Sequence, residues 1–178
     1  MPNVFGIEVS SVEEIVDALR IHGDAVRGVY RARYRFSGAG DPYNGATLER
    51  PTSMAKNPPA TVFPWEQIFV AAATCAGSDY PMLAAHLGVP IDHVEFVVQG
   101  MFDPRDEFDG LDGYCAPADG RGCYLSLHLR ATLTSSAPRA ALERIHARVV
   151  ERNMVLGALR GIPRSDELRV EAPASARA

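Results

Sequence analysis

The feature that most constrains the fold is a run of small and apolar residues that begins at Trp65 and ends at Ala76. Four prolines from Pro51 to Pro64 exclude a central strand or helix and predict an extended loop before this run. Pro64 itself stands where helices favour proline, in the first turn. Because the run is apolar almost all round, we expect a buried central helix, which Pro81 should kink.

Alternating polar and apolar residues predict a sheet beside this helix. The segment VYRARYRF places Arg31, Arg33 and Arg35 on one face of a strand and its aromatic residues on the other. The three arginines are expected to form either a solvated outer face or a contact with an anion or an active site. Strands are predicted at residues 29–36, 45–50, 94–101, 125–133 and 167–172.

Two further helices are predicted at residues 10–22 and 138–152, from their capping residues and the helical spacing of their apolar side chains. Residues 102–123 are rich in glycine and aspartate and are expected to form a long polar loop. Strands and helices do not alternate regularly along the chain, so the predicted fold class is α+β. The expected organisation is a helical extension at residues 1–28, one domain at residues 29–172 and a frayed tail at residues 173–178.

Composition excludes several classes of protein. The 178 residues are 47% hydrophobic and 22% charged, as expected for an ordinary globular protein, and the net charge of -4 provides no basic surface for nucleic acid. The first residues lack the pattern of a secretory signal, and the apolar stretch at residues 68–76 is about half the roughly 20 residues that a bilayer span needs. We therefore expect a cytoplasmic protein with no membrane or nucleic-acid partner.

The three cysteines, Cys75, Cys115 and Cys123, are too few for a disulfide scaffold and do not have the spacing of a zinc site. The histidines show no metal-binding spacing either, and no metal or cofactor is predicted. A reducing compartment makes free thiols the expectation. A cysteine on an apolar helix is most often an inert small hydrophobic residue, so the case for a reactive Cys75 depends on its surroundings.

The central helix carries a specific resemblance. Its sequence PWEQIFVAAATC, from Pro64 to Cys75, resembles the P-x-E-x-[LI]-x-x-A-A-x-x-C helix of the OsmC/Ohr family, the osmotically inducible and organic hydroperoxide resistance proteins. Residues 85–95 resemble the family's passage from this helix through G-[VIL]-x-[VIL] into a strand, and GMFDPR at residues 100–105 resembles G-x-x-D-x-R. The similarity covers residues 29–172, and the N-terminal helix is typical of a longer OsmC-like subgroup.

The resemblance implies a bent antiparallel sheet wrapped on two central helices, in an intertwined homodimer with its active sites at the interface. It also implies a peroxidase in which a thiolate attacks the distal peroxide oxygen beside an arginine that a glutamate holds. Cys75 matches the thiol and Glu66 the glutamate. The arginine remains open among Arg31, Arg33 and Arg35 on the first strand and Arg50 before the proline-rich loop.

Helix geometry separates Glu66 from Cys75. Cys75 follows Glu66 by nine residues, a spacing that turns a helix by about 900° and leaves the side chains roughly half a turn apart with an axial rise of about 13 Å. On one straight helix the two side chains cannot meet. A site that uses both therefore needs Glu66 from the loop side or from a partner subunit.

The family's resolving cysteine is missing from this chain. Asn153 stands at the position of that cysteine, where the longer subgroup often has serine, and asparagine cannot form a disulfide with Cys75. Cys115 and Cys123 have three possible roles. Either could act as the resolving thiol, the two could form a disulfide with each other, or both could be reduced thiols without a role. Otherwise the resemblance implies an external thiol reductant.

The leading hypothesis is a peroxidase for organic hydroperoxides with Cys75 and Glu66 as catalytic residues. Trp65, Asp79, Tyr80 and Asn153 are the predicted substrate-binding residues. The first alternative is an enzyme of the same fold that uses Cys75 for nucleophilic or acid–base chemistry on a small metabolite. The second is a non-catalytic dimer that binds a small molecule at its interface.

Overall fold

The computed structural model describes residues 3–4, 7–8, 13–14, 16–17, 19–21, 27–43, 45–50, 64–116, 118 and 124–173. The chain divides into two compact units, residues 1–29 with 101–125, and residues 30–100 with 126–178. Segment 101–125, which the sequence placed with the predicted domain at 29–172, therefore groups with the N-terminal residues. The proline-rich loop after Pro51 and most of the predicted tail lie outside the described residues.

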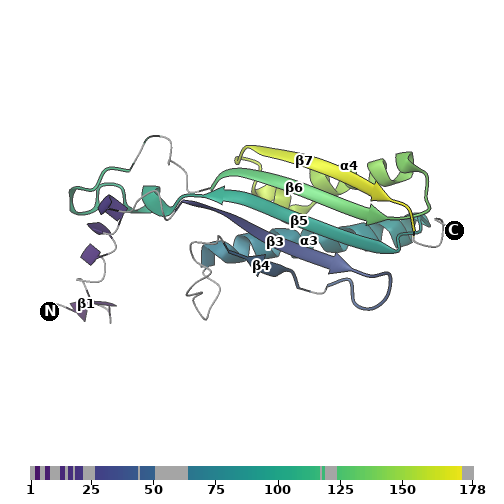
Figure 1. Cartoon of the computed structure of the whole chain (residues 1–178), viewed down its shortest axis with the longest axis horizontal. Coiled ribbons are helices and arrows are strands. Elements are labelled where there is room, and N and C mark those ends of the chain that lie inside the picture. Colours follow the sequence, from purple (N-terminus) through teal and green to yellow (C-terminus); the bar gives the residue numbers. More distant parts are fainter. Residues whose placement is uncertain are drawn as a thin grey trace. The chain divides into compact units, whose positions relative to one another are not determined.

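The larger unit is built on a five-stranded sheet (Figure 1). Its strands, in spatial order, are β4 (Thr47–Glu49), β3 (Gly28–Phe36), β5 (His93–Phe102), β6 (Tyr124–Thr134) and β7 (Arg164–Glu171). Each lies where the sequence predicts a strand. Tyr30, Ala32 and Tyr34 are buried while Arg31 and Arg35 are exposed, which confirms the predicted alternation along β3.

The sheet is mixed, which corrects the expectation of an antiparallel one. Strands β3 and β4 are antiparallel, with Ala32 opposite Leu48, but β6 and β7 are parallel, with Leu129 opposite Asp166. The chain between β6 and β7 forms helices α4 (Arg139–Arg152) and α5 (Met154–Ala158). A parallel pair needs a crossover of this length, because a tight turn can only reverse the strand direction.

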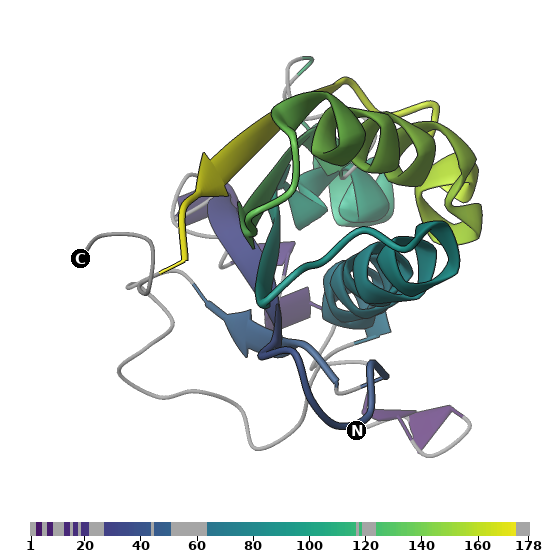
Figure 2. The same ribbon diagram turned by 90° about the vertical axis from the view of Figure 1, so that its right-hand side faces the viewer.

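Helices α3 (Pro64–Leu87) and α4 lie side by side against one face of the sheet (Figure 2). Inward-facing strand residues pack against the small residues of α3 and the apolar stripe of α4. The buried apolar side chains of this unit include Tyr30, Tyr34, Phe69, Ala72, Ala76, Tyr80, Phe96, Val98, Leu129, Leu133, Leu142, Ile145, Val149 and Leu156.

Helix α3 contains Pro81 and ends at Leu87, just before Gly88, as the sequence predicts. It differs from the expectation in that it is not buried all round, since Gln67, Ala71 and Met82 are exposed. By length and composition it is the one helix among the described residues that could cross a membrane, with 44% of its most apolar window buried in the protein. The core helix of a globular protein has the same properties.

The smaller unit has its own apolar contacts. Residues described between 13 and 21 are helical, which confirms the predicted N-terminal helix there, and Val16 and Leu19 pack with Tyr114. The predicted polar loop contains two 3-10 helices, η1 (Pro104–Phe108) and η2 (Leu111–Gly113). Asp103 caps η1 and forms a buried ion pair with Arg105, 2.7 Å between Oδ2 and Nη2, so residues 103–108 have local structure that the composition of the segment did not indicate.

Close packing of α3 on the sheet predicts the effect of one substitution. A Cβ at Gly77 would lie 2.3 Å from Cδ1 of Tyr34, whose side chain is fully buried and donates its hydroxyl hydrogen to the Pro42 carbonyl oxygen at 2.6 Å. We expect Gly77→Ala to lower the free energy of unfolding by about 1–3 kcal/mol, although alanine favours a helix more than glycine. Urea unfolding followed by circular dichroism measures the change.

The matched control for this prediction is Gly157→Ala on helix α5. A Cβ at Gly157 meets no atom within 4 Å, so the substitution should leave stability unchanged or raise it by up to about 1 kcal/mol. Equal stability changes in the two variants would show that the contact between α3 and Tyr34 is not close.

Candidate functional site

Glu66 and Arg50 form a buried ion pair at the start of α3. The Arg50 guanidinium donates from Nε to Oε1 at 2.5 Å and from Nη2 to Oε2 at 2.7 Å, and the Glu66 side chain is fully buried. The first turn of a helix favours a carboxylate, and the two parallel hydrogen bonds fix its orientation. The hydrogen bonds to Glu66 raise the pKa of Arg50. Of the four candidate arginines, Arg50 is therefore the one that the structure joins to Glu66.

The aromatic residues beside this pair are Tyr30 and Trp65. Their rings are 4.7 Å apart in an edge-to-face arrangement. Burial, and secondarily the negative charge of Glu66, raise the pKa of Tyr30 to about 12. Trp65, a predicted substrate-binding residue, thus packs near the ion pair and does not line the cavity at Cys75 that is described below.

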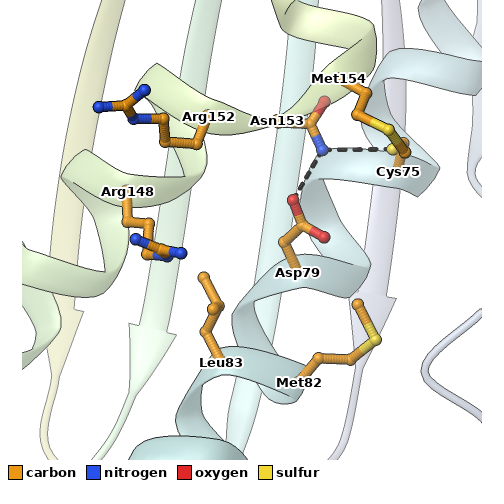
Figure 3. Close-up of a pocket in the computed structure, with 8 residues that line it drawn as sticks. All are labelled: Cys75, Asp79, Met82, Leu83, Arg148, Arg152, Asn153 and Met154. Carbon is orange, nitrogen blue, oxygen red and sulfur yellow. Dashed lines mark hydrogen bonds between the residues drawn. The ribbon is translucent and has the colours of Figure 1, made fainter.

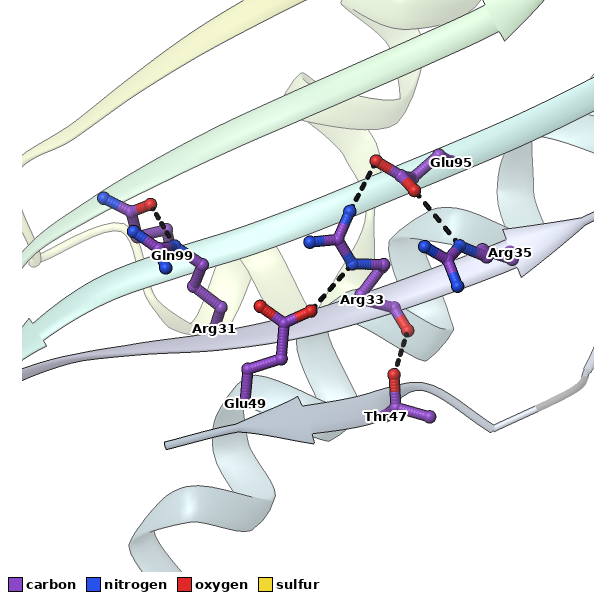
Figure 4. Close-up of polar contacts among 7 residues, drawn as sticks. All are labelled: Arg31, Arg33, Arg35, Thr47, Glu49, Glu95 and Gln99. Atoms are coloured by element: carbon purple, nitrogen blue, oxygen red, sulfur yellow. Dashed lines mark hydrogen bonds and ion pairs between the residues drawn. The ribbon is translucent and has the colours of Figure 1, made fainter. Parts of the chain in front are cut away.

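The remaining candidate arginines lie on the sheet face that the helices leave uncovered (Figure 4). Arg33 donates to Glu49 at 2.9 Å and to Glu95 at 2.7 Å, and Arg35 donates to Glu95 at 3.1 Å. Arg31 donates to Gln99 at 2.6 Å. These contacts favour the interpretation of the arginine stripe as a solvated outer face over an active-site contact.

Cys75 is half-buried on α3, beside the junction between α4 and α5 (Figure 3). The Asn153 side chain donates one Nδ2 hydrogen bond to Sγ of Cys75 at 3.2 Å and another to Oδ2 of Asp79 at 2.8 Å. Its Oδ1 accepts from the backbone N–H groups of Val155 and Leu156, at 3.1 and 3.0 Å. Asn153 thereby caps α5, and the cap directs its amide hydrogens at the sulfur and the carboxylate.

The Cys75 sulfur borders a cavity of about 300 Å³, a volume within the range of small-molecule sites. Its walls combine apolar, acidic and basic side chains from α3 and from the end of α4 (Figure 3). The lining residues are Cys75, Asp79, Met82, Leu83, Arg148, Arg152, Asn153 and Met154. Asp79 and Asn153 were predicted at the site, whereas the two arginines were not singled out by the sequence analysis.

Tyr80, the fourth predicted substrate-binding residue, lies in the core and not in this cavity. Its hydroxyl is 2.7 Å from Nδ1 of His146, whose Nε2 is 3.1 Å from Oδ2 of Asp166. Burial is the main reason that the pKa of Tyr80 is raised, and the charges of Asp166 and Asp79 add to it. Tyr80 and Asp79 are neighbours in sequence, but a helix turns about 100° per residue and so directs them to different sides.

The structure does not bring Glu66 and Cys75 together within one chain. Glu66 faces Arg50 in the interior, while Cys75 faces Asn153 and the cavity. This agrees with the half-turn separation expected from their nine-residue spacing. Cys115 is a free, exposed thiol in the smaller unit, and Cys123 lies outside the described residues.

In the part of the chain that the structure describes, no three His, Cys, Asp or Glu residues are grouped so as to hold a metal ion. The described cavity brings together a thiol, a neighbouring amide donor, a carboxylate and two guanidiniums.

Comparisons with known proteins identify the fold. No protein-family model and no curated protein matches the chain. Among solved structures, an OsmC-like hydroperoxide resistance protein from Jannaschia sp. CCS1 is similar, with a TM-score of 0.51 and 13% sequence identity over 76% of this chain and 87% of that one. This likeness shows that the chain has an OsmC-like fold, as the sequence resemblance implied.

Two further structures give lower scores. An OsmC-like protein from Mycoplasma pneumoniae matches with a TM-score of 0.48 and 13% identity, over 79% of this chain and 94% of that one. A hypothetical protein from Aquifex aeolicus VF5 matches with a TM-score of 0.49 and 10% identity, over 79% of this chain and 97% of that one.

The buried ion pair predicts a large effect of Glu66→Gln on stability. The amide keeps the shape of the side chain but leaves the Arg50 guanidinium without its carboxylate, so we expect the free energy of unfolding to fall by about 2–4 kcal/mol. Urea unfolding followed by the fluorescence of Trp65 measures it. Glu143→Gln is the control, because Glu143 pairs with Arg139 on the surface, and removal of such an exposed pair costs about 0.5 kcal/mol or less. Similar losses in both variants would contradict a structural role for the buried pair.

Proposed function

We propose that the protein is a cysteine-dependent peroxidase that reduces organic hydroperoxides, with Cys75 as the nucleophile. The observation that carries the proposal is the Cys75 sulfur, which borders a small-molecule cavity and accepts a hydrogen bond from Asn153. Met82, Leu83 and Met154 give this cavity apolar walls suited to the organic part of a hydroperoxide. The similarity in fold to a protein described as a hydroperoxide resistance protein supports the same activity.

In the proposed reaction the Cys75 thiolate attacks the distal oxygen of the hydroperoxide. A sulfur–oxygen bond forms, the oxygen–oxygen bond breaks, and the alkoxide leaves as an alcohol after it takes a proton from water. Cys75 becomes a sulfenic acid. The Asn153 amide contributes by donating to the sulfur, because a hydrogen bond to a charged acceptor favours the thiolate over the thiol.

A thiolate also needs positive charge nearby. Within one chain Arg50 is directed at Glu66, and Arg148 and Arg152 lie on the opposite side of the cavity from the sulfur (Figure 3). We assign the missing cation to Arg50 of a second copy in a homodimer. Around Cys75, α3 presents a partly exposed surface that includes Ala71 and Met82, and Met154 on α5 is 82% exposed. Such a surface is suited to contact with another copy. In this arrangement Glu66 holds the guanidinium and acts through it as a positioning residue.

The sulfenic acid then needs a thiol for its reduction. Asn153 stands beside Cys75 where a resolving cysteine would have to be, so we infer that the reductant is an external thiol. This requirement fits a reducing compartment, for which we propose the cytoplasm. Cys115 and Cys123 are the alternative sources of a resolving thiol.

A second candidate function rests on Asp79. Its carboxylate is held 2.8 Å from the same amide that contacts Cys75, which places a thiol and a carboxylate at one small cavity. That pair also suits nucleophilic or acid–base chemistry on a small metabolite. A covalent adduct at Cys75, detected by intact mass without peroxide consumption, would favour this function over the peroxidase. If Cys75 neither reacts with a hydroperoxide nor forms a covalent adduct, a non-catalytic binding protein is favoured.

The peroxidase proposal predicts rapid oxidation of Cys75 by cumene hydroperoxide. In stopped-flow measurements at pH 7, thiol loss should be at least about 100-fold faster than for free cysteine, and Cys75→Ser should abolish it. Asn153→Asp keeps an oxygen that can cap α5 but removes the amide donor, so oxidation should slow about tenfold or more. Cys115→Ser is the control and should leave the rate unchanged. A rate no faster than that of free cysteine would exclude the proposal.

The shared site predicts complementation between two inactive variants. Cys75→Ser and Arg50→Ala should each be inactive alone, but a mixed dimer contains one site with an intact Cys75 and the intact Arg50 of the other copy. Mixing the variants through mild denaturation and refolding should restore up to about a quarter of the peroxidase activity, since half of the dimers are mixed and each has one of two sites intact. No recovery, with mixed dimers confirmed by native mass spectrometry, would show that the site is not shared.

A further inference from the structure

Two guanidiniums border the cavity without a carboxylate partner. Arg148 and Arg152 lie one turn apart on α4, both exposed, and both line the cavity that contains the Cys75 sulfur. Among the described residues, neither side chain makes a hydrogen bond or an ion pair, whereas Arg139 on the same helix pairs with Glu143. Two like charges at this spacing repel each other, and an anion placed between them removes that cost.

The positions of these groups set the shape of a molecule that reaches both the sulfur and the cations. The two guanidiniums lie on one side of the cavity, and the Cys75 sulfur with Met154 lies on the other (Figure 3). Leu83 also lines the cavity, and it follows Cys75 by eight residues, which corresponds to about 12 Å along a helix. A ligand that contacts both sides therefore carries its anionic groups apart from its reactive atom, as a short peptide does.

The catalytic cycle requires such a second molecule at Cys75. The cavity contains no other thiol among the residues described, and Asn153 cannot resolve a sulfenic acid. A reducing thiol that enters this cavity reaches the same sulfur as the hydroperoxide. The apolar side chains suit the hydroperoxide, and the guanidiniums suit a thiol that carries carboxylates.

We propose that Arg148 and Arg152 bind the carboxylates of a low-molecular-weight thiol that reduces the oxidised Cys75, an inference that rests on the proposed peroxidase function. The thiolate of this molecule attacks the sulfur of the Cys75 sulfenic acid, a sulfur–sulfur bond forms and the sulfur–oxygen bond breaks. The hydroxide leaves as water with the proton that the thiol released. A second molecule of the thiol attacks the mixed disulfide, which frees Cys75 as the thiol and releases the symmetrical disulfide.

The test compares two probes of nearly equal size, glutathione and its diethyl ester. In the ester, both carboxylates are masked. The full-length chain carries Cys115→Ser and Cys123→Ser, so that Cys75 is its one thiol. After oxidation by one equivalent of cumene hydroperoxide, loss of the sulfenic acid is followed by intact mass, and rates are expressed per thiolate concentration. Glutathione should react about tenfold faster than the ester, because two charged contacts at an exposed site contribute about that factor.

Arginine variants assign this preference to the cavity. The double variant Arg148→Gln with Arg152→Gln should reduce the ratio of the two rates to about twofold or less, and 0.5 M salt should weaken the preference in the unsubstituted chain. Arg144→Gln is the matched control, because Arg144 is an exposed arginine of α4 that does not line the cavity. An unchanged ratio in the double variant, or a ratio near one in the unsubstituted chain, would overturn the proposal.

A second measurement separates this inference from the peroxidase function. The reduced chain reacts with 5,5′-dithiobis(2-nitrobenzoate), a dianion, and with neutral 4,4′-dithiodipyridine, and neither reaction involves a peroxide. An arginine-dependent preference for the dianion supports anion recognition at Cys75, and its absence overturns it. If hydroperoxides fail to oxidise Cys75, the peroxidase proposal and the reductant role fall together, while disulfide exchange still decides whether the guanidiniums select anions.

Discussion

The close packing of helix α3 on the sheet is the constraint on which the rest of the structure depends. Small residues let the helix approach the strands so closely that Gly77 leaves room for the ring of Tyr34 and Gly100 leaves room for the ring of Phe69. This contact fixes both the depth and the rotation of the helix. As a result, Glu66 is directed inward at one end of α3, and Cys75 is directed toward α5 in the middle.

The same helix separates two chemical groups that a thiol peroxidase needs in one place. Arg50 and Glu66 are joined by two hydrogen bonds in the interior, and the cavity at Cys75 is bordered by Asn153 and Asp79 instead. A buried ion pair is too costly to break for a conformational change to bring Arg50 to the sulfur of its own chain. A second copy of the chain resolves this conflict without breaking the pair, which is why the proposed site is shared.

The site at Cys75 also differs from that of an enzyme with a resolving cysteine. Asn153 occupies the position from which a second thiol would reach Cys75, and its amide is committed to the sulfur, to Asp79 and to the α5 cap. The asparagine thus orders the cavity, and in the proposed cycle reduction is left to an external molecule. Arg148 and Arg152 at the edge of the cavity are the charges that we propose this molecule recognises.

The sequence by itself determined the local elements and singled out Cys75 as the position for which we propose reactivity. The periodicity of polar and apolar residues predicted the strands, as the alternation along β3 shows. The resemblance to a family motif predicted the central helix and the placement of Asn153 near the Cys75 sulfur. Only the tertiary structure decided which arginine holds Glu66, that Tyr80 is a core residue, and that β7 runs parallel to β6. Those outcomes depend on contacts between segments far apart in the chain, which no local pattern specifies.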